Sequence, residues 1–275
     1  MGKLRRIAKT KKVGHLGTLD PIATGVLPLV IGRATRLAQF YTHNSKTYEG
    51  VVRFGWSTDT YDRAGAPTSK VREATVSADA LEVLLDGFRG EFLQTPPAVS
   101  AKKVEGKRAY ELARKSIDVQ LQPVMVHVHE LTLLSIAGAD VTLRVRCSAG
   151  TYMRAIAHDL GEQAGCGAHL RDLRRTVSGD FDIMQARTIE QLESLAENER
   201  LVEALIPSAT MLPHFPSIYV DEVTTVQIRH GRSFPASPFR AQPAAKNVKA
   251  ISSAGELIAI GEEILPNLYH PSVVF

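Results

Sequence analysis

Cysteine is scarce in this chain of 275 residues, which contains only Cys147 and Cys166. The two form no CxxC pair, so they cannot build a zinc site by themselves, and they suggest no disulfide framework. The sequence also lacks a P-loop, a GxGxxG fingerprint and a cluster of metal ligands. We therefore expect a protein of the reducing cytoplasm that needs neither a metal nor an organic cofactor.

Long hydrophobic runs are also missing. The longest, Val26–Ile31, is interrupted by Pro28 and is far shorter than the ~20 residues that a membrane span needs. The basic start, MGKLRRIAKTKK, is not followed by the apolar stretch of a secretory signal. The composition, with 44% hydrophobic and 23% charged residues, is that of a globular protein. This composition excludes wholesale disorder. Because the apolar runs are short, we expect no membrane partner.

Acidic residues are rare near the start of the chain. Residues 1–58 contain ten lysines and arginines but only two acids, Asp20 and Glu49, although the whole chain has 33 basic and 29 acidic residues. A one-sided positive segment attracts a phosphate backbone, although a solvated terminus is the commoner explanation for a basic tail alone. A second basic run favours a nucleic-acid partner, and it consists of Lys102, Lys103, Lys107, Arg108, Arg114 and Lys115.

Strand and helix patterns follow one another through the first 205 residues. Strict alternation of apolar residues predicts strands over residues 47–54 and 141–147, and the polar stretch 57–75 predicts a loop between them. Helices are predicted where apolar residues recur at helical spacing or where a capping box opens the segment, as at Thr188 and Gln191. These expected helices cover residues 81–88, 106–115, 151–164 and 188–205.

The number of strands joined by short turns is too high for a doubly wound fold. We therefore expect an α+β fold with a mixed, largely antiparallel sheet and flanking helices. Pro207, Pro213 and Pro216 mark a boundary, so the main domain should span residues 1–212. A small β-rich domain is expected over residues 213–275, with a helical turn ending near Gly231 and strands at 248–251, 256–260 and 272–275.

The most unusual segment is GHLGTLDPIATG, residues 14–25, which combines three glycines with an Asp-Pro step. An aspartate before proline is usually a turn residue, and spacing alone favours that interpretation. However, Asp20 is the only acid in the first 48 residues and is set among cations. A carboxylate in such a field stays ionised, as a nucleophile must.

Five ordered motifs resemble those of the TruB family of tRNA pseudouridine synthases. The resemblance extends over nearly the whole chain, and the C-terminal strands resemble the family's small PUA-like RNA-binding domain. The motifs are GHLGTLDPIATGVLPLVIGRATR from residue 14, Lys46-Thr47-Tyr48, PPAVSAKKVEGKRAYELAR over 96–114, CSAGTYMRAIAHDLG over 147–161 and GAHLRDLRRT over 167–176.

The resemblance implies a bacterial-type enzyme that isomerises uridine 55 in the T arm of tRNA to pseudouridine. It implies catalysis without a cofactor or a guide RNA, and we expect a monomer. By resemblance Asp20 is the nucleophile, Tyr48 stacks on the flipped-out base, and Arg154 pairs with the catalytic aspartate. Without the motifs, Tyr48 would be interpreted as a core aromatic residue and Arg154 as a phosphate contact.

Further residues receive roles from the same resemblance. Tyr152 and Leu173 match two pocket positions and would otherwise be assigned to packing. His15 matches the histidine that helps to hold the RNA loop open, although a lone histidine in a glycine-rich loop is more often structural. The expected phosphate contacts are Lys11, Lys12, Lys102, Lys103, Lys107 and Arg108.

In one respect the chain departs from the family pattern. Members usually carry a further stretch before residue 11, with a Lys-Pro-x-Gly-x-Thr-Ser motif on a first strand and helix, which this sequence does not contain. Either the start codon is assigned too late or the protein is naturally short. In the second case, we expect a strand next to the site to be missing and an edge of the sheet to be uncovered.

Two other functions fit parts of the same sequence. A non-catalytic tRNA-binding or folding protein would need only the basic segment and the C-terminal domain. An RNA-guided enzyme would keep the chemistry, but the short chain lacks the extended termini expected for docking partners.

Overall fold

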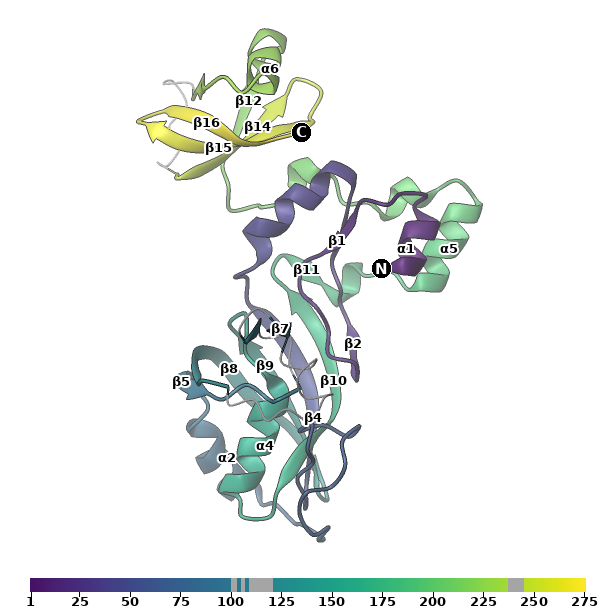
Figure 1. The fold of residues 1–275 in the computed structure, drawn as a ribbon, viewed down its shortest axis with the longest axis vertical. Helices are drawn as coiled ribbons and strands as arrows, with labels where there is room; N and C mark the ends of the chain where they lie inside the picture. Colours follow the sequence, from purple (N-terminus) through teal and green to yellow (C-terminus); the bar gives the residue numbers. More distant parts are fainter. Residues whose placement is uncertain (100–102, 105–106, 109–120, 237–244) are drawn as a thin grey trace. The chain divides into compact units, whose positions relative to one another are not determined.

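The computed structural model describes residues 1–99, 103–104, 107–108, 121–236 and 245–275, and Figure 1 colours them along the sequence. The chain forms two compact units. The expected domain boundary between residues 212 and 213 falls inside the first unit and stays a prediction. The first unit consists of Met1–Leu16, Pro28–Tyr41 and Arg187–Phe275, and the second of Gly17–Leu27 and Thr42–Ala186.

A seven-stranded sheet organises the second unit. Its strands are β2 (Ala23–Gly25), β4 (Lys46–Phe54), β5 (Gly90–Gln94), β8 (Val124–Ala137), β9 (Asp140–Cys147), β10 (Ala168–Ser178) and β11 (Phe181–Asp182). Their order is β11-β10-β4-β9-β8-β5, with β2 paired to β10. That last pair is parallel and the others are antiparallel. The predicted mixed, largely antiparallel sheet is therefore confirmed.

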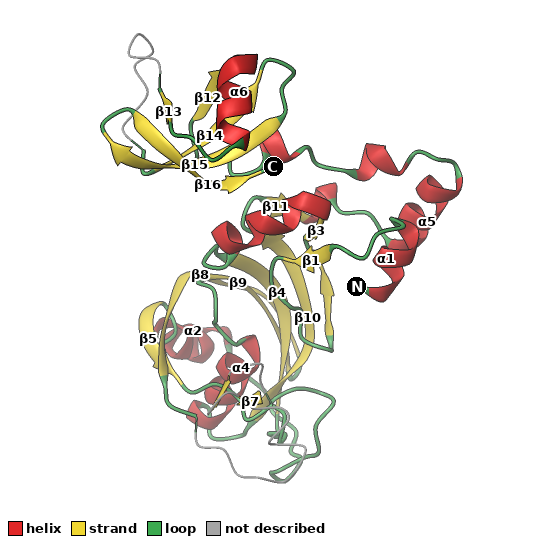
Figure 2. Ribbon diagram, turned by 45° about the horizontal axis from the view of Figure 1, so that its top comes forward, coloured by secondary structure: helices red, strands yellow, loops and turns green. Residues whose placement is uncertain are grey.

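Two helices, α2 (Ala78–Asp86) and α4 (Met153–Gln163), cover one face of this sheet (Figure 2). They share one apolar core with strands β4, β8, β9 and β10. The alternation predicted for β9 is confirmed, because Val141, Leu143, Val145 and Cys147 are all fully buried. Helix α4 approaches β10 closely at Gly161, where a Cβ atom would lie 2.0 Å from the backbone nitrogen of Ala168.

The helix predicted over residues 106–115 is wrong where the structure describes it. Lys107–Arg108 form strand β7, which pairs antiparallel with β6 (Lys103–Val104). The rest of that prediction, residue 106 and residues 109–115, lies outside the described part of the chain.

The first unit contains the N-terminal elements α1 (Gly2–Ile7), β1 (Val13–His15), β3 (Leu29–Ile31) and the 3₁₀ segment η1 (Gly32–Tyr41). It also contains α5 (Ile189–Glu197), whose predicted capping box between Thr188 and Gln191 is present. The predicted extension of this helix to residue 205 is wrong. Glu199 has a positive φ of 58°, which ends the right-handed helix before the short 3₁₀ turn Leu201–Ala204.

A separate five-stranded sheet closes the chain. Its order is β12-β14-β15-β16-β13, and helix α6 (Glu222–Arg229) packs with it around a core that includes Ile228 and Phe234. The expected small β-rich part is confirmed, although its two shortest strands were not foreseen. The strands are β12 (Ser217–Val220), β13 (Phe234–Pro235), β14 (Asn247–Ser252), β15 (Leu257–Leu265) and β16 (Leu268–Val274).

Candidate active site

Asp20 lies on the loop Gly17–Ile22, which leads into strand β2. Its backbone oxygen accepts a hydrogen bond from Ala23 at 2.9 Å, which closes a turn around Pro21. Strand β2 then pairs with β10, so that both the turn and the sheet restrain the loop. The Asp20 side chain is 27% exposed, which leaves its carboxylate accessible from outside.

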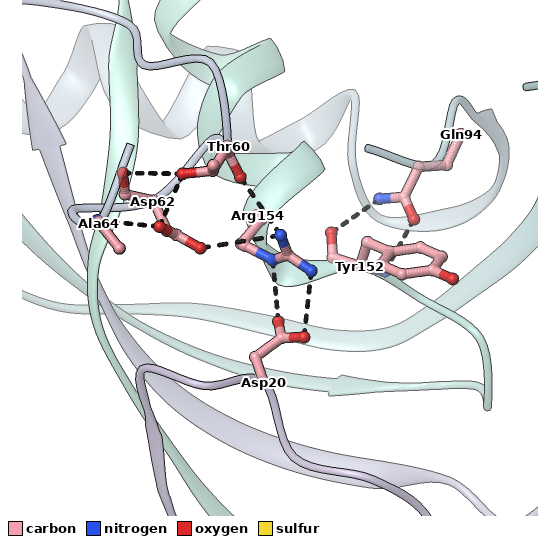
Figure 3. A network of polar contacts seen from close by, with 7 residues as sticks. All are labelled: Asp20, Thr60, Asp62, Ala64, Gln94, Tyr152 and Arg154. Atoms are coloured by element: carbon pink, nitrogen blue, oxygen red, sulfur yellow. Dashed lines mark hydrogen bonds and ion pairs between the residues drawn. The ribbon is translucent and has the colours of Figure 1, made fainter. Parts of the chain in front are cut away.

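Arg154 binds the Asp20 carboxylate with two parallel hydrogen bonds. Its Nε donates to one carboxylate oxygen at 3.0 Å and its Nη2 donates to the other at 3.1 Å (Figure 3). This bidentate geometry fixes the plane of the carboxylate as well as its position. Asp20 follows a run of N-terminal cations in the sequence, but Arg154, the partner that the family resemblance implies, comes from the first turn of α4.

A second carboxylate supports the guanidinium from its other side. Asp62 Oδ2 lies 3.7 Å from Arg154 Nη1, which also donates to the Thr60 backbone oxygen at 3.3 Å. The other oxygen of Asp62 accepts from the Thr60 hydroxyl and from the Ala64 backbone, at 2.8 and 2.9 Å. Asp62 is 6% exposed and Arg154 is 4% exposed, so the pair is buried behind the accessible Asp20.

Sequence analysis missed Asp62. The residue lies in the polar stretch 57–75, where an aspartate is expected as an ordinary loop residue. Nothing in its spacing distinguishes it from the neighbouring Asp59.

The start of helix α4 is held by a buried amide. The Gln94 side chain accepts from the Tyr152 backbone nitrogen at 2.8 Å and donates to the Tyr152 backbone oxygen at 3.1 Å. Gln94 is fully buried at the end of β5, and Tyr152 is the residue that precedes α4. Figure 3 shows this clamp next to the Asp20–Arg154 pair. These two hydrogen bonds fix the position at which the helical turn that carries Arg154 begins. Sequence analysis assigned no role to Gln94.

Tyr48 and Leu173 lie on neighbouring strands of the sheet. Tyr48 is half-buried and packs against the core, and Leu173 is a buried member of that core. Burial raises the pKa of the Tyr48 hydroxyl, and the nearby Arg175 guanidinium opposes this rise. The Asp20 carboxylate is close enough to raise the Tyr48 pKa slightly further. The phenol is therefore neutral at neutral pH.

The predicted site residues are divided between the two units. Asp20, Tyr48, Tyr152, Arg154 and Leu173 all lie in the second unit. In the first unit, His15 ends strand β1 and is exposed, as are the expected phosphate contacts Lys11 and Lys12. Of the remaining expected contacts, Lys103, Lys107 and Arg108 lie in the β6–β7 hairpin, and Lys102 lies outside the described residues.

Neither a metal centre nor a membrane helix is found in the described part of the chain. No group of three or more histidine, cysteine, aspartate or glutamate side chains there is arranged to hold a metal ion. None of the described helices has the length and apolar character needed to cross a bilayer.

Comparison with known proteins identifies a family over residues 5–213. Residues 5–153 match the N-terminal domain of the TruB family of pseudouridylate synthases. Residues 154–213 match the C-terminal domain of tRNA pseudouridylate synthase B.

Individual relatives extend these matches. The protein named tRNA pseudouridine synthase B from Solibacter usitatus (strain Ellin6076) is 68% identical over 274 residues, covering 100% of this chain and 94% of that protein. Its namesake from Stutzerimonas stutzeri (strain A1501) is 40% identical over 94% of this chain and 85% of its own. A chain in the crystal structure of a Cbf5-Nop10-Gar1 complex superposes with a TM-score of 0.69 at 25% identity, over 96% of this chain and 73% of that one. The chain therefore belongs to the TruB family of pseudouridylate synthases.

Proposed function

We propose that this protein isomerises uridine 55 in the T arm of tRNA to pseudouridine, with Asp20 as the nucleophile. One observation carries the proposal: an accessible carboxylate held in a fixed plane by a buried guanidinium, 3.0 and 3.1 Å away. Such a pair holds the carboxylate in one orientation before substrate arrives. The names of the curated relatives support tRNA as the substrate.

The proposed reaction needs few protein groups besides Asp20 and Arg154. The bond between the ribose C1′ and the base N1 breaks, the base turns, and C1′ rejoins it through C5. N1 gains a proton and C5 loses one, so the atoms balance without a redox step or a group carrier. Asp20 supplies the nucleophile in either of two routes, by attack on the anomeric carbon as in a retaining glycosidase or by attack on the uracil ring.

The target base must leave its stack to reach Asp20. In our proposal the ring of Tyr48 stacks on the flipped base and replaces part of the lost stacking energy. Tyr152 and Leu173 complete the pocket wall, and His15 holds the RNA loop open after flipping. Arg154 orients Asp20 and stays paired with it during the reaction.

We further propose that the protein acts on free tRNA, as a monomer and without a guide RNA. The exposed Lys11 and Lys12 contact the RNA backbone, as do Lys102, Lys103, Lys107 and Arg108, and the C-terminal β-rich part adds a PUA-like RNA-binding surface. The basic excess of residues 1–58 supports this arrangement.

The test is conversion of an unmodified tRNA transcript by the purified protein without added cofactor or RNA. We expect pseudouridine at position 55, and none in a transcript with cytidine at that position. Asp20→Asn keeps the size of the side chain and removes the nucleophile, so turnover should fall by roughly 1,000-fold or more while tRNA binding is retained. The matched control is Asp86→Asn, which changes an exposed carboxylate that pairs with Arg89. Full activity of Asp20→Asn would refute the assignment of Asp20 as the nucleophile.

The non-catalytic alternative, a tRNA-binding or folding protein, makes a different prediction for the same assay. Binding that weakens with salt but yields no pseudouridine would favour it.

A further inference from the structure

Arg175 is the largest fully buried side chain among the described residues, with 1% of its surface exposed, and the reaction above gives it no role. We infer that Arg175 is a positioning residue that fixes the backbone of the loop carrying Asp20, an inference that rests on the proposed function. It would act on the nucleophile through the main chain, whereas Arg154 acts on the carboxylate directly.

The guanidinium of Arg175 binds the loop at both ends. Its Nη2 and Nη1 donate to the backbone oxygens of Gly17 and Thr18, at 3.1 and 3.2 Å, just before Asp20 in the sequence. Its Nε donates to the backbone oxygen of Val26 at 2.8 Å, just after β2. One rigid planar group thus ties together the two segments that flank the nucleophile.

The main chain of Arg175 holds the same loop. Its backbone oxygen accepts a hydrogen bond from the Val26 nitrogen at 2.9 Å, and in the sheet it faces Gly25 on one side and Tyr48 on the other. Gly25 has a φ of 98°, and a Cβ atom there would lie 2.1 Å from the Arg175 oxygen. The loop is therefore pressed against Arg175 by contacts that no larger residue at position 25 would allow.

The donors of Arg175 bind the loop and the Tyr48 side chain, and not a counter-ion. Within the described ranges of the chain, no carboxylate forms an ion pair with Arg175, whereas Arg154 pairs with two. A buried arginine that served packing alone would be expected to have a carboxylate partner. A second buried cation, Lys46, lies close enough to interact with Arg175. Burial lowers the pKa of Lys46, and the charge of Arg175 lowers it further. Three backbone oxygens hold a cation here despite that repulsion.

The arrangement predicts that the shape of the guanidinium matters, beyond its charge. A lysine at position 175 would keep the charge but could not reach three acceptors that a rigid fork reaches at once. Asp20 would then sample positions away from the reacting atom, and misplacement by about 1 Å costs on the order of 100-fold in rate.

The experiment compares the same substitution at two adjacent positions. Arg175→Lys is paired with Arg174→Lys, because Arg174 is the exposed neighbour on the same strand. Both variants are assayed with tRNA for kcat and KM, and amide hydrogen exchange is measured over residues 17–26. We expect Arg175→Lys to lower kcat by about 100-fold with KM within about twofold. We expect its loop amides to exchange at least about tenfold faster while those of helix α2 do not change. Arg174→Lys should alter none of these quantities.

Wild-type kcat, or unchanged exchange in the loop, would overturn the inference. If wild-type protein makes no pseudouridine, the proposed function fails, and loop exchange alone then decides the role of Arg175. If Arg175→Lys does not fold, Gly25→Ala tests the same clamp from the loop side with the guanidinium intact. It should accelerate loop exchange and lower kcat in the same way, and normal values of both would again overturn the inference.

Discussion

At the scale of single residues, Arg154 is the centre of the site. It is nearly fully buried, binds Asp20 through two nitrogens and approaches Asp62 with a third. A buried cation between two carboxylates is held firmly, because each carboxylate limits the movement that the other would allow. The exposed member of the trio, Asp20, thereby gains an orientation that a surface carboxylate lacks.

Arg154→Lys should lower kcat by at least about 100-fold, because a lysine cannot hold both oxygens of Asp20 in one plane. The measurement is single-turnover pseudouridine formation at saturating tRNA. Arg89→Lys is the control, since Arg89 forms exposed ion pairs with Glu82 and Asp86 that contribute little. Equal rates for the two variants would contradict the role given to the bidentate pair.

The residues of the site differ in how far the sequence could predict them. Asp20 and Arg154 are 134 positions apart, and only the family motifs connected them before the structure placed them together. Asp62, Gln94 and Arg175 act through hydrogen bonds to backbone or to another side chain. Such contacts have no sequence period, so burial in three dimensions is what distinguishes these residues from ordinary polar ones.

At the scale of elements, the first turn of α4 determines where Arg154 lies. This turn begins after Tyr152, whose backbone nitrogen and oxygen both bind the fully buried side chain of Gln94. A helix whose first residue is fixed in this way delivers its side chains to constant positions.

Gln94→Met should remove both hydrogen bonds to the Tyr152 backbone, whose oxygen keeps the bond that it accepts from the Ile156 nitrogen at 3.2 Å. We expect a loss of about 2–3 kcal/mol of stability and a fall of roughly 5 °C or more in melting temperature. The turnover rate should fall as well, because the helical turn that carries Arg154 is no longer held in place by Gln94. Calorimetry and the tRNA assay together check this. The exposed Gln227 of α6 provides the control Gln227→Met, which should change neither quantity. A stable, fully active Gln94→Met protein would show that the clamp is dispensable.

Long elements with regular periods were predictable, and short or interrupted ones were not. Strands β4 and β9 alternate between buried and less buried residues over most of their length and were found from the apolar alternation in the sequence. Strand β2 is three residues long and has no alternation to recognise, although it carries the loop of the site into the sheet. The end of helix α5 depends on the positive φ of Glu199. A glutamate gives no sequence signal for this conformation.

At the scale of the whole molecule, charge is distributed unevenly along the chain. Residues 1–58 hold ten of the 33 basic residues and two of the 29 acidic ones. If this segment binds tRNA as proposed, we expect the affinity to fall steeply with salt, because bound phosphates release counterions.

Replacing both Lys11 and Lys12 by alanine should weaken tRNA binding and flatten its salt dependence. If each contacts one phosphate, the slope of log Kd against log salt falls by about one for each lysine. The rate at saturating tRNA should not change. Filter binding between low and moderate salt measures the slope. Arg200→Ala is the control, because Glu203 already neutralises that exposed guanidinium. An unchanged slope for the double variant would exclude these lysines from the RNA interface.

The hydrogen bond between Arg175 Nε and the Val26 backbone oxygen joins residues that are 149 positions apart. On a ribosome that adds 5–20 residues per second, the loop bearing Asp20 emerges about 7–30 s before the strand that holds it. During that interval Asp20 lacks both Arg154, which binds its carboxylate, and Arg175, which binds its loop. Assembly of this hydrogen-bond network is therefore a late event in biosynthesis, because it requires strand β10.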